Sequence, residues 1–293
     1  MANFDIYAAI TDRIIAELEN GIIPWHKPWT GTTTGAISRE TGRPYSLLNQ
    51  MLLGTPGEYL TWNQVKKEGG SVKKGAKAKM VVFWKVYPRE KKNADGQTVT
   101  DTEGKPVMEG LPVLRYFNVF HIDDCEGIKP KYTAETTKHA DPIQYAEETF
   151  ADYVSRSGVR FENVRQDRAY YSPSMDLIRL PLMEQFPDTA EYYSTLFHEA
   201  THSTGHAKRL DRLPKDAIAA HFGSEEYSKE ELVAEIGAAS ILNVLGIETA
   251  GTFKNSAAYI RSWLKALKND KRMIVSAAAR AEKAVKLILN TAE

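Results

Sequence analysis

Hydrophobic positions along the chain change period several times, and each period predicts a different kind of element. Isoleucine or leucine recurs at every fourth position near the N-terminus, which predicts an amphipathic helix over residues 4–20. Two runs rich in β-branched and aromatic residues, 79–87 and 111–122, predict strands. The polar, glycine-containing segment 88–110 between them is typical of a long hairpin loop.

Capping signals predict further helices. A threonine, serine or aspartate followed three residues later by glutamate or glutamine is the capping box that opens a helix, and aspartate before proline is a related start signal. These signals occur at Thr61 with Gln64, Asp141 with Pro142, Asp188 with Glu191, and Ser228 with Glu231. Remaining segments predict a short helix at 46–53, short strands at 159–164 and 175–180, and two last helices near 256–268 and 271–290.

This alternation predicts an α+β protein of two domains, over 1–135 and 140–293, joined by the aperiodic polar region 123–140. A chain of 293 residues is long for one core and typical of two domains.

Charge is balanced overall but not locally. The chain has 38 Lys and Arg against 38 Asp and Glu, whereas the segment from Lys66 to Lys92 carries a net charge of +8. Cys125 is the only cysteine, so no internal disulfide is possible and a reducing cytoplasm is expected. The N-terminus lacks the apolar run of a signal peptide, and no stretch approaches the roughly 18 apolar residues of a membrane span, so we expect no membrane partner.

The segment His198-Glu199-Ala200-Thr201-His202 carries the clearest chemistry. Two histidines four residues apart leave the same face of a helix and can both bind one Zn²⁺ ion. Glu199 is rotated away from the metal but can reach an attacking water as general base. The motif therefore predicts a single-metal hydrolase of the zincin type, although two surface histidines on an amphipathic helix are the alternative.

The third metal ligand is less certain from the pattern. Lys208 occupies the position of the third histidine of the metzincin motif, which excludes that subclass. We predict Glu235, on the next helix, as the third ligand, because small residues after it allow two helices to pack closely. Glu231 is interpreted as a capping-box residue and His206 as a surface residue at a helix end, and both stay open as ligands.

The N-terminal part combines aromatic and basic residues. Four of the five tryptophans lie at positions 25, 29, 62 and 84, in the same region as Lys73, Lys74 and Lys77. Rings on which bases stack and lysines that contact phosphates are what single-strand binding requires. The alternative is that the tryptophans are core residues and the lysines form a solvated surface.

At these residues the sequence resembles the ArdC family of plasmid antirestriction proteins, and its N-terminal half is also similar to TraC-type plasmid primases. The resemblance covers nearly the whole chain. It rests on residues 5–15, 24–29, 41–45, 61–65, 72–85, 117–120, 198–206, 209–212 and 230–235.

The resemblance implies an N-terminal module that binds single-stranded DNA and a C-terminal zincin-like, SprT-like metallopeptidase domain. It also implies protection of incoming plasmid DNA from host restriction during conjugation. The expected partners are single-stranded DNA and proteins bound to DNA or belonging to the restriction system. The residues expected to contact DNA are Trp25, Trp29, Arg43, Tyr45, Lys73, Lys74, Lys77, Lys79 and Lys85.

Two further functions compete with this one. The chain could be a metalloprotease that DNA directs to DNA-bound proteins, or a protein that masks DNA and retains a vestigial metal site. A structural zinc site needs no general base, so Glu199 favours an enzyme. A nuclease is disfavoured, because a single metal without a second carboxylate cluster suits two-metal phosphodiester chemistry poorly.

Overall fold

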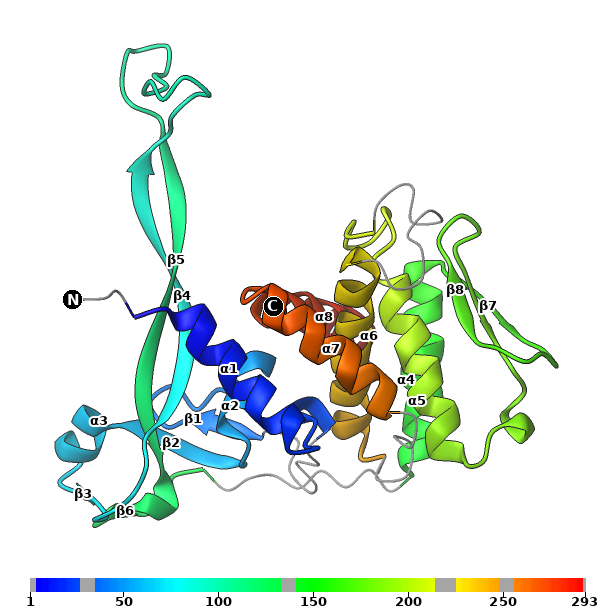
Figure 1. The fold of residues 1–293 in the computed structure, drawn as a ribbon, viewed down its shortest axis with the longest axis horizontal. Coiled ribbons are helices and arrows are strands. Elements are labelled where there is room, and N and C mark those ends of the chain that lie inside the picture. The colour runs from blue at the N-terminus through cyan, green and yellow to red at the C-terminus, as the bar shows by residue number, and fades with distance from the viewer. Residues whose placement is uncertain (1–3, 27–34, 133–140, 214–224, 248–255, 292–293) are drawn as a thin grey trace.

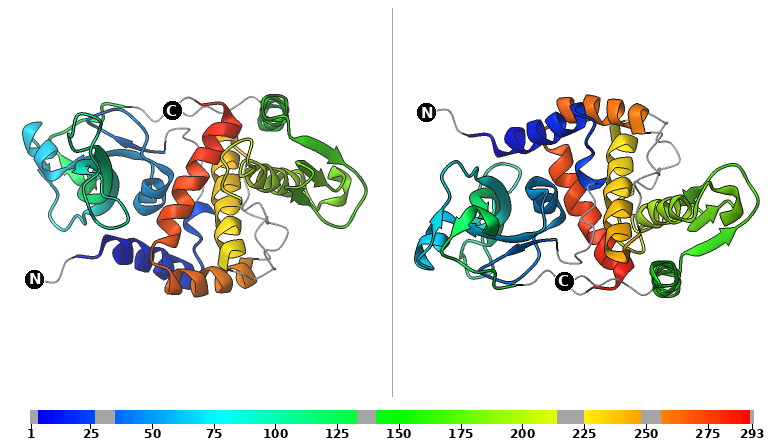
Figure 2. Two further views of the ribbon diagram at one scale, coloured as in Figure 1. Left: turned by 90° about the horizontal axis from the view of Figure 1, so that it is seen from above. Right: turned by 90° about the horizontal axis from the view of Figure 1, so that it is seen from below.

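A layer of helices separates a sheet-containing N-terminal part from a small sheet at the opposite end (Figure 1). The computed structural model describes residues 4–26, 35–132, 141–213, 225–247 and 256–291. Views from above and below show the same order, with the helices between the two sheets (Figure 2). This arrangement confirms the predicted α+β class.

The N-terminal part is built on a four-stranded sheet of order β1-β2-β5-β4, in which β1 and β2 are parallel and the other pairs antiparallel. A second pair of very short strands, β3 and β6, is antiparallel. The elements are α1 (Ile6–Glu19), η1 (Pro24–His26), β1 (Ala36–Ser38), α2 (Leu47–Leu53), β2 (Gly57–Thr61), α3 (Trp62–Lys67), β3 (Ser71–Val72), β4 (Lys79–Glu90), β5 (Met108–His121), η2 (Ile122–Asp124) and β6 (Cys125–Glu126).

The C-terminal part is mainly helical, with a three-stranded sheet of order β7-β9-β8. Strand β9 runs parallel to β7 and antiparallel to β8. The elements are α4 (Pro142–Ser157), β7 (Arg160–Asn163), β8 (Tyr170–Ser172), β9 (Leu177–Leu180), η3 (Met183–Gln185), α5 (Thr189–Ser203), α6 (Glu225–Leu245), α7 (Ser256–Asn269) and α8 (Met273–Leu289).

Three of the four capping signals open helices as predicted. Thr61 and Gln64 form the reciprocal capping box of α3, while Asp141 and Asp188 accept backbone hydrogen bonds at the starts of α4 and α5. The fourth prediction is wrong. The described part of α6 begins at Glu225, so Ser228 lies inside the helix and Glu231 is not a capping residue.

The hydrophobic core continues across the expected boundary between the two domains. Trp25 is only 2% exposed, and its ring packs edge-on against Trp263 with centroids 5.2 Å apart. Thr11 on α1 also donates a hydrogen bond to the carbonyl of Lys271 (2.7 Å). The same cluster of buried side chains includes Ile10, Ile14, Met51, Leu52, Leu232, Ile236, Leu267, Ile274 and Ala278. The two halves therefore share part of their core.

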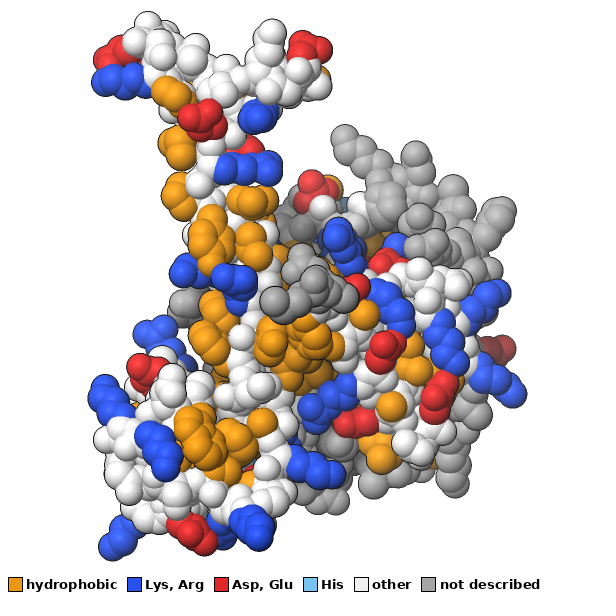
Figure 3. All heavy atoms as spheres, turned by 60° about the vertical axis from the view of Figure 1, so that its left-hand side comes forward, with side chains coloured by type: hydrophobic (Ala, Val, Ile, Leu, Met, Phe, Trp, Pro, Cys, Tyr) orange, Lys and Arg blue, Asp and Glu red, His pale blue; other side chains and the backbone are white. Residues whose placement is uncertain are grey.

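Strands β4 and β5 form a long antiparallel ribbon whose far end extends away from the body (Figure 1). Its base is anchored by Asn49 of α2, whose side-chain amide hydrogen-bonds both backbone groups of Val82 (2.7 and 2.8 Å). Pairing continues from Lys79 with Val119 to Glu90 with Met108, so the loop is shorter than the predicted 88–110. Hydrophobic side chains and lysine or arginine lie together along the ribbon (Figure 3).

Candidate metal centre

Helix α5 presents the two histidines of the sequence motif on one face. Phe197 and Ala200 are buried and hold the other side of the helix in the core. The rings of His198 and His202 are tilted by 78° with centroids 4.7 Å apart, and their Nε2 atoms lie 3.1 Å apart. The predicted spacing thus brings two imidazole nitrogens to one point.

Helix α6 brings a carboxylate to the same point. Glu231 lies with one oxygen 3.5 Å from Nε2 of His198 and the other 3.3 Å from Nε2 of His202. Ligand atoms of these three residues all lie within 4.8 Å of one another. Close packing of α6 on α5 makes this possible, since a Cβ at Gly237 would lie 2.6 Å from Cγ2 of Thr201.

Two other carboxylates of α6 lie on the Nδ1 sides of the imidazoles, away from the point where the Nε2 atoms meet. Glu235 has an oxygen 3.6 Å from Nδ1 of His198, and Glu230 has one 3.2 Å from Nδ1 of His202. Glu235, the ligand preferred from the sequence, therefore faces the outer nitrogen of its histidine. Glu231 does not cap a helix, and its carboxylate lies at the point between the two histidines that both Nε2 atoms face.

The site is strongly polarised. Burial lowers the pKa of both histidines, but hydrogen bonds and charges from the acidic neighbours outweigh it, so the pKa values of His198 and His202 are raised above normal. Burial conversely raises the pKa of Glu231, yet hydrogen bonds from the two imidazoles hold that pKa far below its usual range. Proton sharing of this kind is what a divalent cation replaces when it binds.

The donor set fits a divalent metal ion. Two imidazoles and one carboxylate are the three protein ligands of a common class of catalytic zinc sites, which leave a fourth position for water or substrate. Glu199 directly follows His198, is only 9% exposed, and its charge raises the pKa of His202. It is thus an acidic group beside the three ligands and outside the set that they form.

His206 lies one turn beyond His202 but outside the ligand group. Its Nδ1 is 3.9 Å from Asp176 and accepts a hydrogen bond from the backbone of Lys208 (3.2 Å). Asp176, at the turn between β8 and β9, is in turn bound by Arg209 and Tyr171. His206 consequently belongs to a polar cluster between the end of α5 and the small sheet.

Two arginines hold the C-terminal end of α5. Arg209 donates to the carbonyl of Ser203 (2.8 Å) and pairs with Asp176. Arg212 donates to the carbonyl of Thr201 (2.5 Å) and binds Glu230 through two nitrogens (2.7 and 3.0 Å). Arg212 was part of a matched family motif, but its contact with the outer carboxylate of His202 could not be read from spacing.

The residues expected to contact DNA differ in their exposure to solvent. Lys73, Lys74, Lys77, Lys85 and Arg43 are exposed. Within the described residues, these five cations form no ion pair with an acidic side chain.

Three other residues predicted to contact DNA are less accessible to a ligand. Trp25 is buried against Trp263, so its predicted stacking on a base is contradicted by its place in the core. The ammonium of Lys79 donates to the carbonyl of Leu53 (2.7 Å), and Tyr45 packs edge-on against Tyr59. Trp29 lies outside the described residues.

Sequence reasoning counted only Trp84 among the exposed aromatic side chains of β4 and β5. Phe83, Tyr116 and Phe117 are also exposed, although their runs were interpreted as strands and not as aromatic surfaces for bases. The sequence pattern did not show that these two strands pair in a ribbon that extends from the body, and this arrangement is what exposes their side chains.

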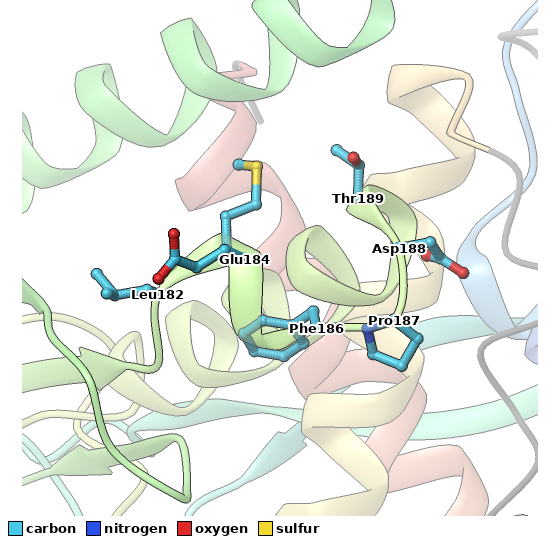
Figure 4. Close-up of a pocket in the computed structure, with 7 residues that line it drawn as sticks. Leu182, Glu184, Phe186, Pro187, Asp188 and Thr189 are labelled. Atoms are coloured by element: carbon cyan, nitrogen blue, oxygen red, sulfur yellow. The ribbon is translucent and has the colours of Figure 1, made fainter.

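A hollow before α5 is distinct from the metal centre. It is lined by side chains of the segment that leads from β9 into α5 (Figure 4). Its residues are Leu182, Met183, Glu184, Phe186, Pro187, Asp188 and Thr189. None of the three clustered ligands lines it.

Comparisons with known proteins match both halves of the chain. Residues 4–120 match the family described as the N-terminal domain of anti-restriction factor ArdC, and residues 148–280 match the family of zincin-like metallopeptidases. Fold and site together define a two-part protein with a zincin-like metallopeptidase domain.

Solved structures match nearly the whole chain. The metal-free crystal structure of antirestriction protein ArdC from plasmid R388 is 35% identical, with a TM-score of 0.72, over 97% of both chains. Its Mn(II)-bound structure is 34% identical, with a TM-score of 0.70, over 98% of both chains. The chain belongs to the ArdC family of antirestriction proteins.

Other relatives are longer or of similar length. Two proteins from Escherichia coli named DNA primase TraC are each 36% identical, over 96% and 94% of this chain. The chain spans only 26% and 19% of their lengths. A Sinorhizobium fredii protein named y4eC is 30% identical over 95% of this chain and 89% of its own. In the parts that the structure describes, no helix is long and apolar enough to cross a membrane.

Proposed function

We propose that this protein binds single-stranded DNA and protects incoming plasmid DNA from restriction during conjugation. The observation that carries this proposal is the match to R388 antirestriction protein ArdC over 97% of each chain, with both halves present. Its relation to proteins named as primases is a second link to single-stranded nucleic acid.

The N-terminal half supports DNA binding by its charge. Lys73, Lys74 and Lys77 project from the segment after β3 without acidic partners among the described residues. Exposed, unpaired lysines release counterions when they contact phosphates, so binding to DNA should weaken as salt rises.

The C-terminal half supports hydrolysis. We propose that His198, His202 and Glu231 hold one divalent metal, with Zn²⁺ as the expected ion. When bound, such an ion acts as a Lewis acid that polarises a carbonyl group and favours ionisation of water. Glu199 then takes the proton of the attacking water and passes it to the leaving amine, as a general base and acid.

Two mechanisms of protection remain to be distinguished. A protein that covers a strand denies access to it, whereas a peptidase recruited by DNA would cleave proteins bound there. Buried Glu199 beside the ligands favours a working hydrolase, and the exposed lysines are compatible with both mechanisms.

Glu199→Ala separates the two mechanisms. The variant should keep its metal and its affinity for single-stranded DNA, because Glu199 is outside the ligand set, while any peptidase rate falls by about 10²- to 10⁴-fold. The experiment then measures conjugative transfer of a plasmid that carries restriction sites into a recipient strain whose restriction enzyme cuts those sites. We expect the variant to protect, which indicates masking, while loss of protection with intact DNA binding indicates proteolysis. If the wild-type chain itself gives no protection, the proposed function fails.

A further inference from the structure

The register of the β4–β5 ribbon sorts its side chains into two chemically different faces. In an antiparallel pair, directly opposed residues project from the same side, and successive residues alternate. Phe83 pairs with Arg115, Lys85 with Val113 and Tyr87 with Leu111. All odd-numbered residues of both strands therefore share one face, called here the odd face, and all even-numbered residues share the even face.

The odd face carries rings and cations together. Phe83 and Phe117 are stacked almost in parallel, with an angle of 5° and centroids 4.9 Å apart, and both rings are exposed. Further along the ribbon, Nζ of Lys85 lies 5.1 Å and Cζ of Arg115 lies 5.9 Å from the Tyr87 ring.

The charges of the odd face are available to a ligand near these rings. Towards the tip, Arg89 is paired with Glu109 at 2.7 Å. In the described part of the chain, Lys85 and Arg115 have no such acidic partner. Two cations that contact the Tyr87 ring but have no acidic partner among the described residues thus lie within a few residues of the stacked pair.

The even face is apolar over the same length. Trp84 is 49% exposed, and Tyr116 contacts the ring of Phe4 with centroids 4.9 Å apart. No charged residue occurs at the even positions from 80 to 88 and from 110 to 118, which are Met80, Val82, Trp84, Val86, Pro88, Gly110, Pro112, Leu114, Tyr116 and Asn118.

We propose that the odd face of the β4–β5 ribbon is the surface on which single-stranded DNA lies. Bases stack on Phe83 and Phe117, and phosphates contact Lys85 and Arg115. This assignment rests on the proposed single-strand binding and names its site.

Single strands suit this face better than a duplex. Aromatic side chains bind exposed base faces, which only unpaired and unstacked bases offer. A two-stranded ribbon can also enter the major groove of duplex DNA, but it then reads base edges with hydrogen-bonding side chains. The centre of the odd face offers phenyl rings instead, so the duplex is the weaker fit.

The test uses the full chain and a fluorescently labelled thymidine 20-mer, with binding followed by anisotropy over a range of salt concentrations. Phe117→Ala should weaken binding by about 5- to 150-fold, because one base loses its stacking partner. Lys85→Gln with Arg115→Gln should reduce the slope of log affinity against log salt by up to about 1.4. A duplex of equal length should bind more weakly and respond less to Phe117→Ala.

Trp84→Ala is the matched control, because Trp84 neighbours Phe83 and is comparably exposed on the opposite face. It should leave affinity nearly unchanged. Equal losses for Trp84→Ala and Phe117→Ala, or a duplex that binds as tightly as the single strand, would overturn the assignment. So would unchanged binding in the odd-face variants while the wild type binds. If the wild type binds no single strand at low salt, the proposed function fails as well.

Discussion

Each imidazole of the metal centre has its own outer carboxylate. Nδ1 of His202 faces Glu230, and Nδ1 of His198 faces Glu235. When Nδ1–H donates outward, Nε2 keeps its lone pair for the metal, so the outer carboxylates set both the tautomer and the orientation of the rings.

Substitution of Glu231 and of Glu235 should show which carboxylate binds the metal directly and which one only contacts a histidine ligand. Glu235→Gln should lower metal affinity by about 10- to 100-fold, the usual effect of removing an outer partner. Glu231→Gln should lower it further, because a negatively charged ligand is lost. Calorimetric titration of the metal-free chain with Zn²⁺ or Mn²⁺ measures both affinities. The opposite order would make Glu235 the ligand and return Glu231 to an outer position.

At the scale of elements, two arginine–carboxylate ion pairs hold the C-terminal end of α5. They have similar chemistry but link α5 to different elements. Arg212 with Glu230 links α5 to α6 and contacts His202 through Glu230. Arg209 with Asp176 links α5 to the turn between β8 and β9 and contacts neither clustered histidine.

This pairing predicts a difference between two substitutions. Glu230→Gln and Asp176→Asn should each lower the free energy of unfolding by roughly 1 to 3 kcal/mol, because each removes a charged acceptor from a mostly buried arginine. Only Glu230→Gln should also lower metal affinity, by about 10- to 100-fold. Urea unfolding of the metal-free proteins and metal titration together give the comparison. Equal metal affinities in the two variants would limit Glu230 to a structural role.

The contribution of Asp176 should depend on pH. Burial raises its pKa, but hydrogen bonds from Arg209 and Tyr171 outweigh this and hold the pKa below normal. A carboxyl whose pKa is lowered by folding stabilises the protein above the unfolded pKa of about 3.9, and this stabilisation is lost as pH falls through the folded pKa. The difference in unfolding free energy between wild type and Asp176→Asn should therefore be full at pH 7 and shrink below about pH 4.

At the scale of the whole molecule, the shared core joins the N-terminal half to the half that carries the candidate metal centre. Trp25 packs against Trp263, and the same cluster contains Leu232, the residue after Glu231. The face of α6 that enters this cluster and the face that carries the carboxylates belong to one rigid helix, so unfolding of the N-terminal half should disturb the metal centre.

Trp25→Ala tests this connection. Removing a large buried ring should lower the free energy of unfolding by about 3 to 5 kcal/mol. Because the core is shared, circular dichroism, tryptophan fluorescence and metal release should follow one transition in the wild type and in the variant. Trp84→Ala, at an exposed position, should cost little. Separate transitions for fluorescence and metal release would instead support two independently folding domains at 1–135 and 140–293.

Local patterns were enough for most elements and for the core of the site. The spacing of His198 and His202 places both rings on one helical face, whatever surrounds the helix. The capping box at Thr61 and Gln64 and the strand character of 79–87 likewise depend on neighbours a few residues away. Such information acts within a turn or a strand, so the sequence contains it directly.

Contacts between distant segments decided the rest. Which carboxylate of α6 meets the metal-facing nitrogens depends on the rotation of α6 against α5, and the close approach of Gly237 to Thr201 contributes to that rotation. Composition alone could not tell whether Trp25 stacks on a base or fills a core, because the answer depends on Trp263, more than 200 residues away. A side chain's chemistry is local, but its orientation and its neighbours are set by the packing of the whole chain.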